Sequence, residues 1–203
     1  PKAAGTSIEI GLSTLAQADD VLTPNAPEDE ACRREIVTRY GGIDAAQNYR
    51  YSWADVARMG PGALAIALRQ RRRHVRYHSH MLAIHARHAM TAEEWTSAVT
   101  FAVERNPFDR IVSYSFWETR GLTDRPAFGR WFRSSGFRNA SQRHFYTDEG
   151  QQLVDHVIRF EDLEAGLAGV LREAGLPMIP LPRANGGVRP AGTPWREVIP
   201  PAE

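Results

Sequence analysis

The chain contains one cysteine, Cys32, among its 203 residues, so no disulfide can form within it and a structural zinc site is disfavoured. It contains no apolar run long enough to span a bilayer, which argues against a transmembrane segment. Positive and negative charges nearly balance, with a formal net charge of +1, so no general attraction to nucleic acid follows. Lysine is scarce and arginine is abundant, so local arginine clusters are more informative than the total charge.

The first seven residues, PKAAGTS, have the composition of a loop that binds phosphate at the start of a helix. Gly5 allows backbone N–H groups to approach an anion, and Thr6 and Ser7 can cap the helix or donate hydroxyl hydrogen bonds. The helix dipole attracts negative charge to the same place, and Lys2 adds a positive charge beside it. The order differs from the Walker A loop, in which the lysine follows the glycines. An ordinary capped helix is the alternative interpretation.

A second segment, residues 99–117, joins a short apolar strand to a helix. Asn106 fits the N-cap of that helix, and Pro107 fits its first position. Arg105 therefore lies where a strand ends and a helix begins, which is the edge of an open α/β sheet at which ligands bind. Ser113 follows about two helical turns later, so it can share an anion with Arg105.

Together these segments resemble the sulfotransferase superfamily, whose sulfuryl donor is 3′-phosphoadenosine 5′-phosphosulfate. The opening residues resemble the family's 5′-phosphosulfate loop, P-K-[TA]-[GA]-[GS]-[TS], and residues 105–113 match its 3′-phosphate segment, R-[ND]-P-x-[DE]-R-x-x-S. A third segment, residues 154–163, resembles the family's strand-then-helix element R-[FY]-E-D-L. The resemblance extends from residue 1 to about residue 185 and is greatest to the carbohydrate-type, membrane-anchored and bacterial branch.

Two positions depart from the family pattern. Ala3 stands where many members have threonine, and Glu104 stands where an apolar residue is usual. Because side chains alternate along a strand, we expect Glu104 to point away from Arg105 and to pair elsewhere.

The resemblance assigns a role to each residue of the expected donor site. Lys2 would neutralise the leaving group, and Arg105 with Ser113 would hold the 3′-phosphate, for which the planar guanidinium is well suited. The 5′-phosphosulfate would be bound by Lys2, Ala4, Gly5, Thr6 and Ser7. Three alternatives remain open: Lys2 as a surface lysine, Arg105 as an ion-pair or capping arginine, and Ser113 as a helix serine bonded to its own backbone. The family needs no metal, and its nucleotide product is adenosine 3′,5′-bisphosphate.

A histidine is the natural general base near neutral pH, and four of the seven histidines cluster between residues 78 and 88. Residues 77–80 resemble the Y-H-G-H segment of uronyl and glycan 2-O-sulfotransferases, whose second histidine is the base. The match makes His80 the first choice and His78 the second. His85 and His88 have a spacing that can bind a metal, but no carboxylate or cysteine joins them in the sequence, so we expect no metal site.

Strands alternate with helices along the chain, which predicts an α/β protein. We expect a P-loop-like three-layer fold, in which a central parallel sheet has helices on both faces. One sulfotransferase domain would cover residues 1–203, with its first strand upstream of residue 1. The predicted strands are residues 98–104 and 153–159, with a short one at residues 74–78. The predicted helices are residues 6–16, 28–40, 44–59, 62–73, 107–119, 126–135 and 161–174, and residues 80–96 are expected to form one or two helices.

The resemblance thus implies a sulfotransferase that moves a sulfuryl group to a hydroxyl of a carbohydrate or glycolipid, and we expect the protein to be cytoplasmic and bacterial. The basic stretch at residues 69–76 is either a solvated helix end or a rim that attracts anions. Nucleic acid is not expected as a partner, because no aromatic residues are interleaved with these arginines. An aromatic group that includes Trp117 is mostly core by its spacing, although one or two members can stack on adenine or a sugar. The alternative functions are a P-loop kinase-type phosphotransferase and a nucleotide-binding domain without catalysis.

Overall fold

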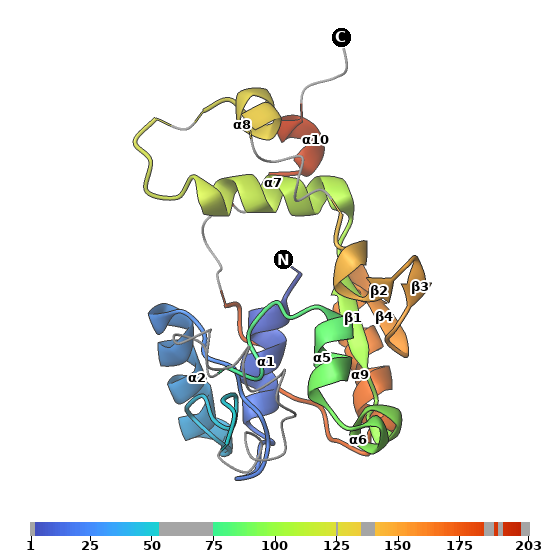
Figure 1. Ribbon diagram of the computed structural model, residues 1–203. Coiled ribbons are helices and arrows are strands. Elements are labelled where there is room, and N and C mark those ends of the chain that lie inside the picture. The colour runs from blue at the N-terminus through green and yellow to red at the C-terminus, as the bar shows by residue number, and fades with distance from the viewer. Residues whose placement is uncertain are drawn as a thin grey trace.

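The structure is a computed structural model that describes residues 3–52, 75–124, 126–134, 141–184, 189–190 and 193–199. It is a mixed α/β protein (Figure 1). The helices are α1 (Gly5–Ser13), α2 (Pro27–Tyr40), α5 (Ala83–Ala89), α6 (Ala92–Ser97), α7 (Pro107–Glu118), α8 (Phe128–Ser134), α9 (Leu163–Glu173) and α10 (Trp195–Val198). The strands are β1 (Phe101–Glu104), β2 (Thr147–Asp148), β3 (Gln151–Gln152) and β4 (His156–Arg159), and the 3-10 turns are η2 (Arg143–Phe145) and η3 (Phe160–Asp162).

The expected parallel pairing is present between β1 and β4, in a register that places Glu104 opposite Arg159. The start of the pair is fixed by Asp155, whose carboxylate accepts hydrogen bonds from the Thr100 backbone N–H at 2.8 Å and from its hydroxyl at 2.7 Å. These hydrogen bonds lower the pKa of Asp155. Because the strands run parallel and in register, the segments that follow them leave the same edge of the sheet.

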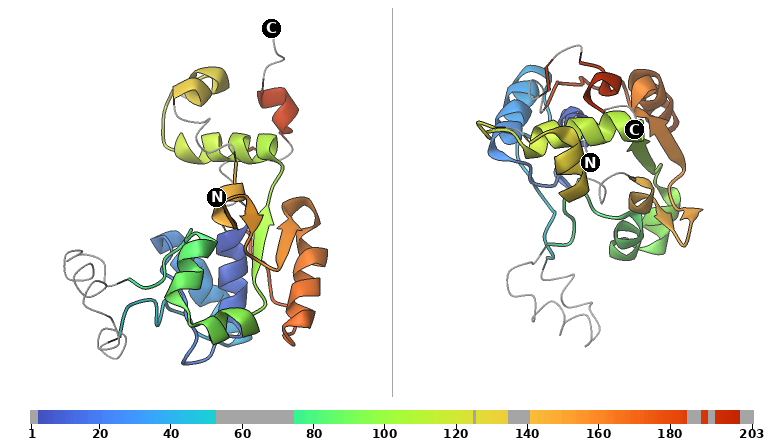
Figure 2. Two further views of the ribbon diagram at one scale, coloured as in Figure 1. Left: turned by 45° about the vertical axis from the view of Figure 1, so that its right-hand side comes forward. Right: turned by 90° about the horizontal axis from the view of Figure 1, so that it is seen from above.

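Helices α1 and α9 lie on opposite sides of this strand pair (Figures 1 and 2). Their apolar faces share one core cluster with β4, to which Phe101 and Val103 of β1 also contribute. The buried members of the cluster are Ile8, Ile158, Leu167, Val170, Leu171 and Ile179. Helix α7 crosses above the start of α1, so the beginning of α1 faces α7 across the end of the sheet (Figure 1).

Local signals in the sequence fix several helix ends. The Asn106 side chain caps α7 by accepting hydrogen bonds from the backbone of Phe108 and Asp109, and a capping box between Thr91 and Glu94 starts α6. Gly175 lies just beyond the C-cap of α9, and its left-handed φ of 69° closes a Schellman motif. The predicted cap at Asn106 is thus confirmed.

The predicted helix over residues 44–59 is wrong for residues 44–52, the part of it that the structure describes. The Gln47 side chain donates to the carbonyls of Gln17 and Asp20, and the Asn48 side chain donates to those of Ala18 and Asp20. Polar side chains that bind a distant turn in this way compete with helix formation. The predicted helix at residues 62–73 lies outside the described residues. None of the helices in the described ranges has both the length and the apolar character to cross a bilayer.

Two glycines on α9 provide a matched test of this packing. A Cβ at Gly166 would lie 2.5 Å from Cγ2 of Ile158, a buried β-branched side chain with little freedom to move, whereas a Cβ at Gly169 would meet nothing closer than 3.9 Å. We expect Gly166→Ala to lower the free energy of unfolding by about 1–3 kcal/mol. Gly169→Ala should raise it by up to about 1 kcal/mol, because alanine favours the helix. Chemical denaturation of both variants measures this difference, and equal effects would contradict the packing of α9 on β4.

Candidate functional site

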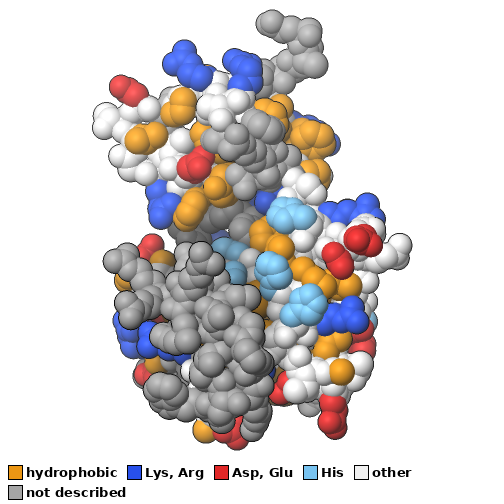
Figure 3. Space-filling view, viewed as in Figure 1, with side chains coloured by type: hydrophobic (Ala, Val, Ile, Leu, Met, Phe, Trp, Pro, Cys, Tyr) orange, Lys and Arg blue, Asp and Glu red, His pale blue; other side chains and the backbone are white. Residues whose placement is uncertain are grey.

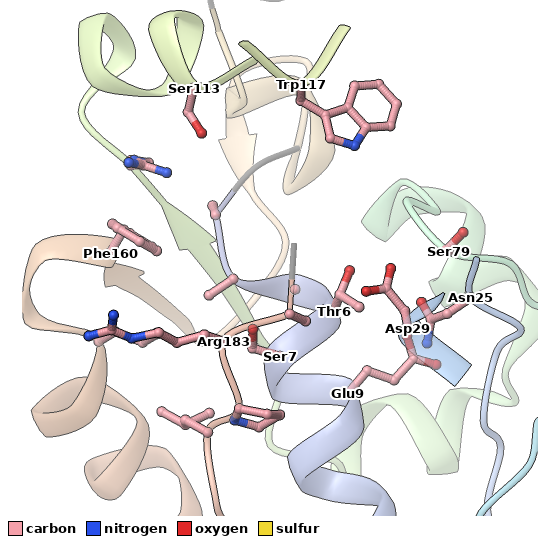
Figure 4. A pocket seen from close by; sticks show the side chains of 18 of the residues that line it. Thr6, Ser7, Glu9, Asn25, Asp29, Ser79, Ser113, Trp117, Phe160 and Arg183 are labelled. Atoms are coloured by element: carbon pink, nitrogen blue, oxygen red, sulfur yellow. The ribbon is translucent and has the colours of Figure 1, made fainter. Parts of the chain in front are cut away.

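A cavity of about 1240 Å³ opens between the start of α1, the ends of β1 and β4, and α7 (Figure 4). Its size exceeds that of most pockets for one small ligand, so it has room for two reactants. Figure 3 shows the molecular surface hollowed between the part that carries α7 and the part below it. The lining includes the described residues of the expected donor site, namely Ala4, Gly5, Thr6, Ser7, Arg105 and Ser113, and also His80.

The start of α1 presents unpaired donors to the cavity. Ala4 precedes the helix with φ of 61°, a left-handed conformation that is unusual for a residue other than glycine, and no side chain caps the helix. The first backbone N–H groups of a helix have no partner within it. In the part of the chain that the structure describes, the hydroxyls of Thr6 and Ser7 also make no hydrogen bond. The alternative in which they cap α1 is therefore not observed, and both remain available to an anion.

Arg105 lies at the turn from β1 to α7, and its backbone is held from two sides. Its N–H donates to the side chain of Gln142 at 3.3 Å, and the next N–H, of Asn106, donates to Glu161 at 3.0 Å. The Arg105 guanidinium lies over the Phe160 ring, 4.2 Å from its centre. Phe160 and Glu161 directly follow β4, so the parallel strand pair itself assembles this corner of the cavity.

The Arg105 side chain is also bound to Asp109, one turn into α7. One Asp109 oxygen accepts from Arg105 Nε at 2.7 Å and Nη2 at 2.5 Å, while the other accepts from Arg189 Nη1 at 2.6 Å. Partial burial would raise the pKa of Asp109, but the two arginines outweigh burial and hold this pKa below its ordinary value. The ion-pair alternative for Arg105 is therefore observed, and it coexists with the residue's place in the cavity wall.

Ser113 lies on the face of α7 that looks into the cavity (Figure 4). Its hydroxyl makes no hydrogen bond with any residue that the structure describes, whereas Ser115, two residues later, donates to the Val112 carbonyl at 2.8 Å. The alternative in which Ser113 bonds to its own backbone is thus not observed. An open hydroxyl on the same cavity as Arg105 is the arrangement expected for sharing one anion.

His80 lines the cavity, while His78 is not among the described residues that do so. His80 adopts φ of 64°, and like Ala4 it is one of the few residues other than glycine with positive φ in the described ranges. Such strained backbone tends to cluster at functional sites. The chain before His80 is anchored by Arg76 Nε and the Tyr77 hydroxyl, which donate to the Ala89 carbonyl at 2.9 Å and 3.3 Å.

The surroundings of His80 favour its neutral form. His80 is exposed at the rim, but the surrounding protein partly desolvates its imidazole. This desolvation lowers the pKa of His80 from its ordinary value of 6.5. The nearby His78 acts in the same direction. A neutral imidazole is the form that can accept a proton.

Carboxylates and an amide from α1, α2 and the loop between them line the cavity across from Phe160, beside Thr6 and Ser79 (Figure 4). Glu9 is held by Arg33, at 3.3 Å, and by the Thr23 hydroxyl at 2.7 Å. The Asn25 amide nitrogen is buried and has no hydrogen-bond partner among the described residues. This wall is rich in oxygen acceptors and differs in character from the end of the cavity that contains Arg105.

Several lining residues were missed by the sequence patterns. Arg183 comes from the loop after α9, lies near Phe160, and pairs with no residue in the described part of the chain (Figure 4). Trp117, expected to be mostly core, lines the cavity with the Arg120 guanidinium 4.2 Å from its ring centre. The sequence around Arg183 is rich in proline and glycine, so no periodic signal marked that residue.

Some predictions fall on residues that the structure does not describe. Lys2 is one of them, so its place at the donor site stays a prediction, and so does the rim formed by most of residues 69–76. Histidine side chains gather on the face that carries α5, which contains His85 and His88 (Figure 3). Within the described ranges, no three histidine, cysteine, aspartate or glutamate side chains are grouped to hold a metal.

Glu104 pairs away from the cavity, as strand alternation predicts. The buried Tyr146 hydroxyl donates to its carboxylate at 2.9 Å. The pKa of Tyr146 is raised to about 12, mainly by burial and in addition by its hydrogen bond to the negatively charged Glu104. The acidic residue next to Arg105 therefore does not face the anion site.

Comparisons with known proteins give no match: no protein-family model fits the sequence, and neither curated proteins nor solved structures are significantly similar to the chain. The assignment of a function therefore depends on the residues and their arrangement.

The Tyr146–Glu104 pair predicts a pH-dependent stability. Because the folded-state pKa of Tyr146 is about 12, above the ordinary value of 10.0, its contribution is complete below pH 10 and is lost as the pH rises towards 12. We expect Tyr146→Phe to cost about 1 kcal/mol at neutral pH, because Glu104 loses its donor. Urea unfolding across the alkaline range should show a smaller decline in the variant than in the wild type. Parallel declines would contradict a folded-state shift at Tyr146.

Proposed function

We propose that this protein is a sulfotransferase that uses 3′-phosphoadenosine 5′-phosphosulfate as its sulfuryl donor. The observation that carries the proposal is the convergence on one cavity of two segments about one hundred residues apart in sequence, the uncapped start of α1 and the Arg105–Ser113 segment. Each resembles a family motif for a different phosphate of the same donor. Nothing in the spacing of the sequence requires the two to meet.

The two ends of the donor would be bound by different chemistry. The backbone N–H groups at the start of α1, with the Thr6 and Ser7 hydroxyls, suit the 5′-phosphosulfate because they combine unpaired donors with the positive end of a helix dipole. Arg105 and Ser113 suit the 3′-phosphate. The exposed Arg183 adds a further positive charge to the lining. The proposed fold is P-loop-like and three-layered, with the β1–β4 pair as part of its central parallel sheet.

In the proposed reaction, His80 accepts the proton of the acceptor hydroxyl as the hydroxyl oxygen bonds to sulfur. The bond between sulfur and the bridging oxygen of the donor breaks, and adenosine 3′,5′-bisphosphate leaves with the electron pair. Lys2, the only lysine of the chain, would neutralise the charge that develops on that oxygen. The lowered pKa of His80 keeps its imidazole neutral and able to act as the base.

The acceptor-rich wall across the cavity from Phe160 supports a carbohydrate or glycolipid acceptor. The oxygen acceptors of Glu9 and Asp29 and the unpartnered Asn25 amide are the groups that bind sugar hydroxyls. Trp117 offers an aromatic ring for a sugar face or for adenine. An acceptor with a carboxylate near its reacting hydroxyl fits this wall poorly, because like charges repel.

A P-loop kinase-type phosphotransferase is the second candidate, since a helix start of this kind also suits the phosphates of ATP. The lysine position of the Walker loop is absent from the opening residues. The third candidate, a nucleotide-binding domain without catalysis, differs from the proposal only in the role of His80.

Ligand selectivity separates the sulfotransferase from the kinase. We expect isothermal titration to show at least about tenfold tighter binding of adenosine 3′,5′-bisphosphate than of ADP. Arg105→Lys should weaken adenosine 3′,5′-bisphosphate by about tenfold to hundredfold, because lysine cannot make the bidentate contact. Arg159→Lys, on an exposed residue of the adjacent strand outside the cavity lining, is the control and should bind normally. Tighter binding of ADP would instead support the kinase.

A base variant separates catalysis from binding. We expect His80→Gln to reduce labelled-sulfate transfer by at least about a hundredfold while leaving the affinity for adenosine 3′,5′-bisphosphate within about twofold. His78→Gln is the matched control and should retain activity. Because the pKa of His80 is lowered from 6.5, the midpoint of the acid limb in a plot of kcat/KM against pH should lie below 6.5. Unchanged turnover in His80→Gln would exclude His80 as the base, and no transfer by the wild type to any hydroxyl acceptor would favour the non-catalytic domain.

A further inference from the structure

The C-terminal arm, residues 189–190 and 193–199, docks on the first turn of α7 next to the cavity corner that contains Arg105. The Trp195 ring stacks on the exposed Phe108 ring, with centres 4.9 Å apart and an angle of 18° between the planes. Arg189 is fixed at both ends of its guanidinium, since it donates to the Thr193 carbonyl within the arm and to Asp109 on α7. Among the residues that the structure describes here, an aromatic contact and an ion pair join the arm to α7.

Asp109 connects the arm to the cavity. Its two oxygens are divided between two arginines, with Arg105 on one and Arg189 on the other. Arg105 lines the cavity, whereas Arg189 is not among the described lining residues. All three side chains are mostly buried, with 15%, 23% and 16% exposure for Arg105, Asp109 and Arg189, so solvent screens their charges only in part.

The net charge of these three residues affects how strongly an anion would bind at Arg105. Arg105 and Asp109 alone form a neutral pair, which would attract a phosphate weakly. Arg189 gives the group a net charge of +1 and draws one carboxylate oxygen away from Arg105. It also restrains the carboxylate that orients the Arg105 guanidinium.

We propose that Arg189 is a positioning residue for the 3′-phosphate end of the donor site, acting through Asp109 on Arg105. This inference rests on the proposed function, because it assigns the anion at Arg105 to the 3′-phosphate of the donor. It extends that function to a residue far from the three sequence motifs. It also makes docking of the C-terminal arm a condition for full donor affinity.

A purely structural role of Arg189, as an anchor of the arm, would give a different result. Loss of an anchor would weaken every ligand of the cavity or lower stability, whereas loss of charge at Arg105 would weaken only ligands with a 3′-phosphate. The informative quantity is therefore the ratio of affinities for adenosine 3′,5′-bisphosphate and 5′-AMP, which differ only in that phosphate.

The experiment measures this ratio by isothermal titration for the full chain. We expect Arg189→Gln to reduce the ratio about fivefold to tenfold with 5′-AMP affinity unchanged, and Arg189→Lys to restore most of it. Arg196→Gln is the matched control, because it removes one positive charge from the same arm at a residue whose guanidinium lies over Trp195 and not beside Asp109. That control should keep the wild-type ratio.

A double-mutant cycle tests the path through Asp109. In an Asp109→Asn background, adding Arg189→Gln should change the ratio by less than about twofold, because no carboxylate remains to transmit the effect. An unchanged ratio in the single variant, an equal loss for Arg196→Gln, an equal loss of 5′-AMP binding, or a full effect in the Asp109→Asn background would each overturn this inference while leaving the proposed function intact. A wild-type protein that does not prefer adenosine 3′,5′-bisphosphate to 5′-AMP would overturn both.

Discussion

The parallel pairing of β1 with β4 is the constraint on which the rest of the site depends. It brings the turn after β1 beside the turn after β4, although about 55 residues separate them along the chain. The Phe160 ring then supports the Arg105 guanidinium, and Glu161 holds the backbone of Asn106, where α7 begins. Without this register, α7 would not place Ser113 over the start of α1. The strand pair is short, but every element of the cavity corner is attached to it.

The distribution of carboxylates explains how an acid-rich cavity can still attract an anion. Glu161 is occupied by a backbone N–H, and Asp162 and Glu164 lie at the start of α9, where the helix dipole offsets their charge. The charge of Glu9 is offset in part by the buried Arg33, which Glu9 shares with Glu30. The positive potential of Arg105 and of the α1 start is therefore opposed less than the number of acids indicates. The cavity has two chemically distinct ends, one rich in donors and the other rich in acceptors.

Local sequence signals predicted the parts of the fold and site that depend on neighbouring residues. The start of α1 near Gly5, the cap at Asn106 and the left-handed Gly175 just beyond α9 follow from rules that act over a few positions, and the structure contains all three. The motif match pointed to Arg105 and Ser113 because both belong to one short continuous segment, the turn after β1 and the helix α7 that follows it.

Features that depend on distant contacts were not predictable in the same way. Residues 44–52 have a helix-like composition, but Asn48 and Gln47 bind the turn at residues 17–20, which no periodicity reveals. Arg183 and Arg189 come from a tail without regular patterning, and only folding brings them to the cavity and to Asp109. The single parallel pair among the described residues is also less than the full central sheet that the alternation of elements predicts.

The fully buried Arg33 has a mechanical consequence for the cavity. Its guanidinium binds Glu9 on α1 and Glu30 on α2, and it also donates to the Thr23 carbonyl in the connecting loop. Moving either helix alone would separate the buried Arg33 from one of its carboxylate partners, and a buried charge that loses its partner costs several kcal/mol. The acceptor-rich wall and the first turn of α1 are therefore linked through one buried network of charges.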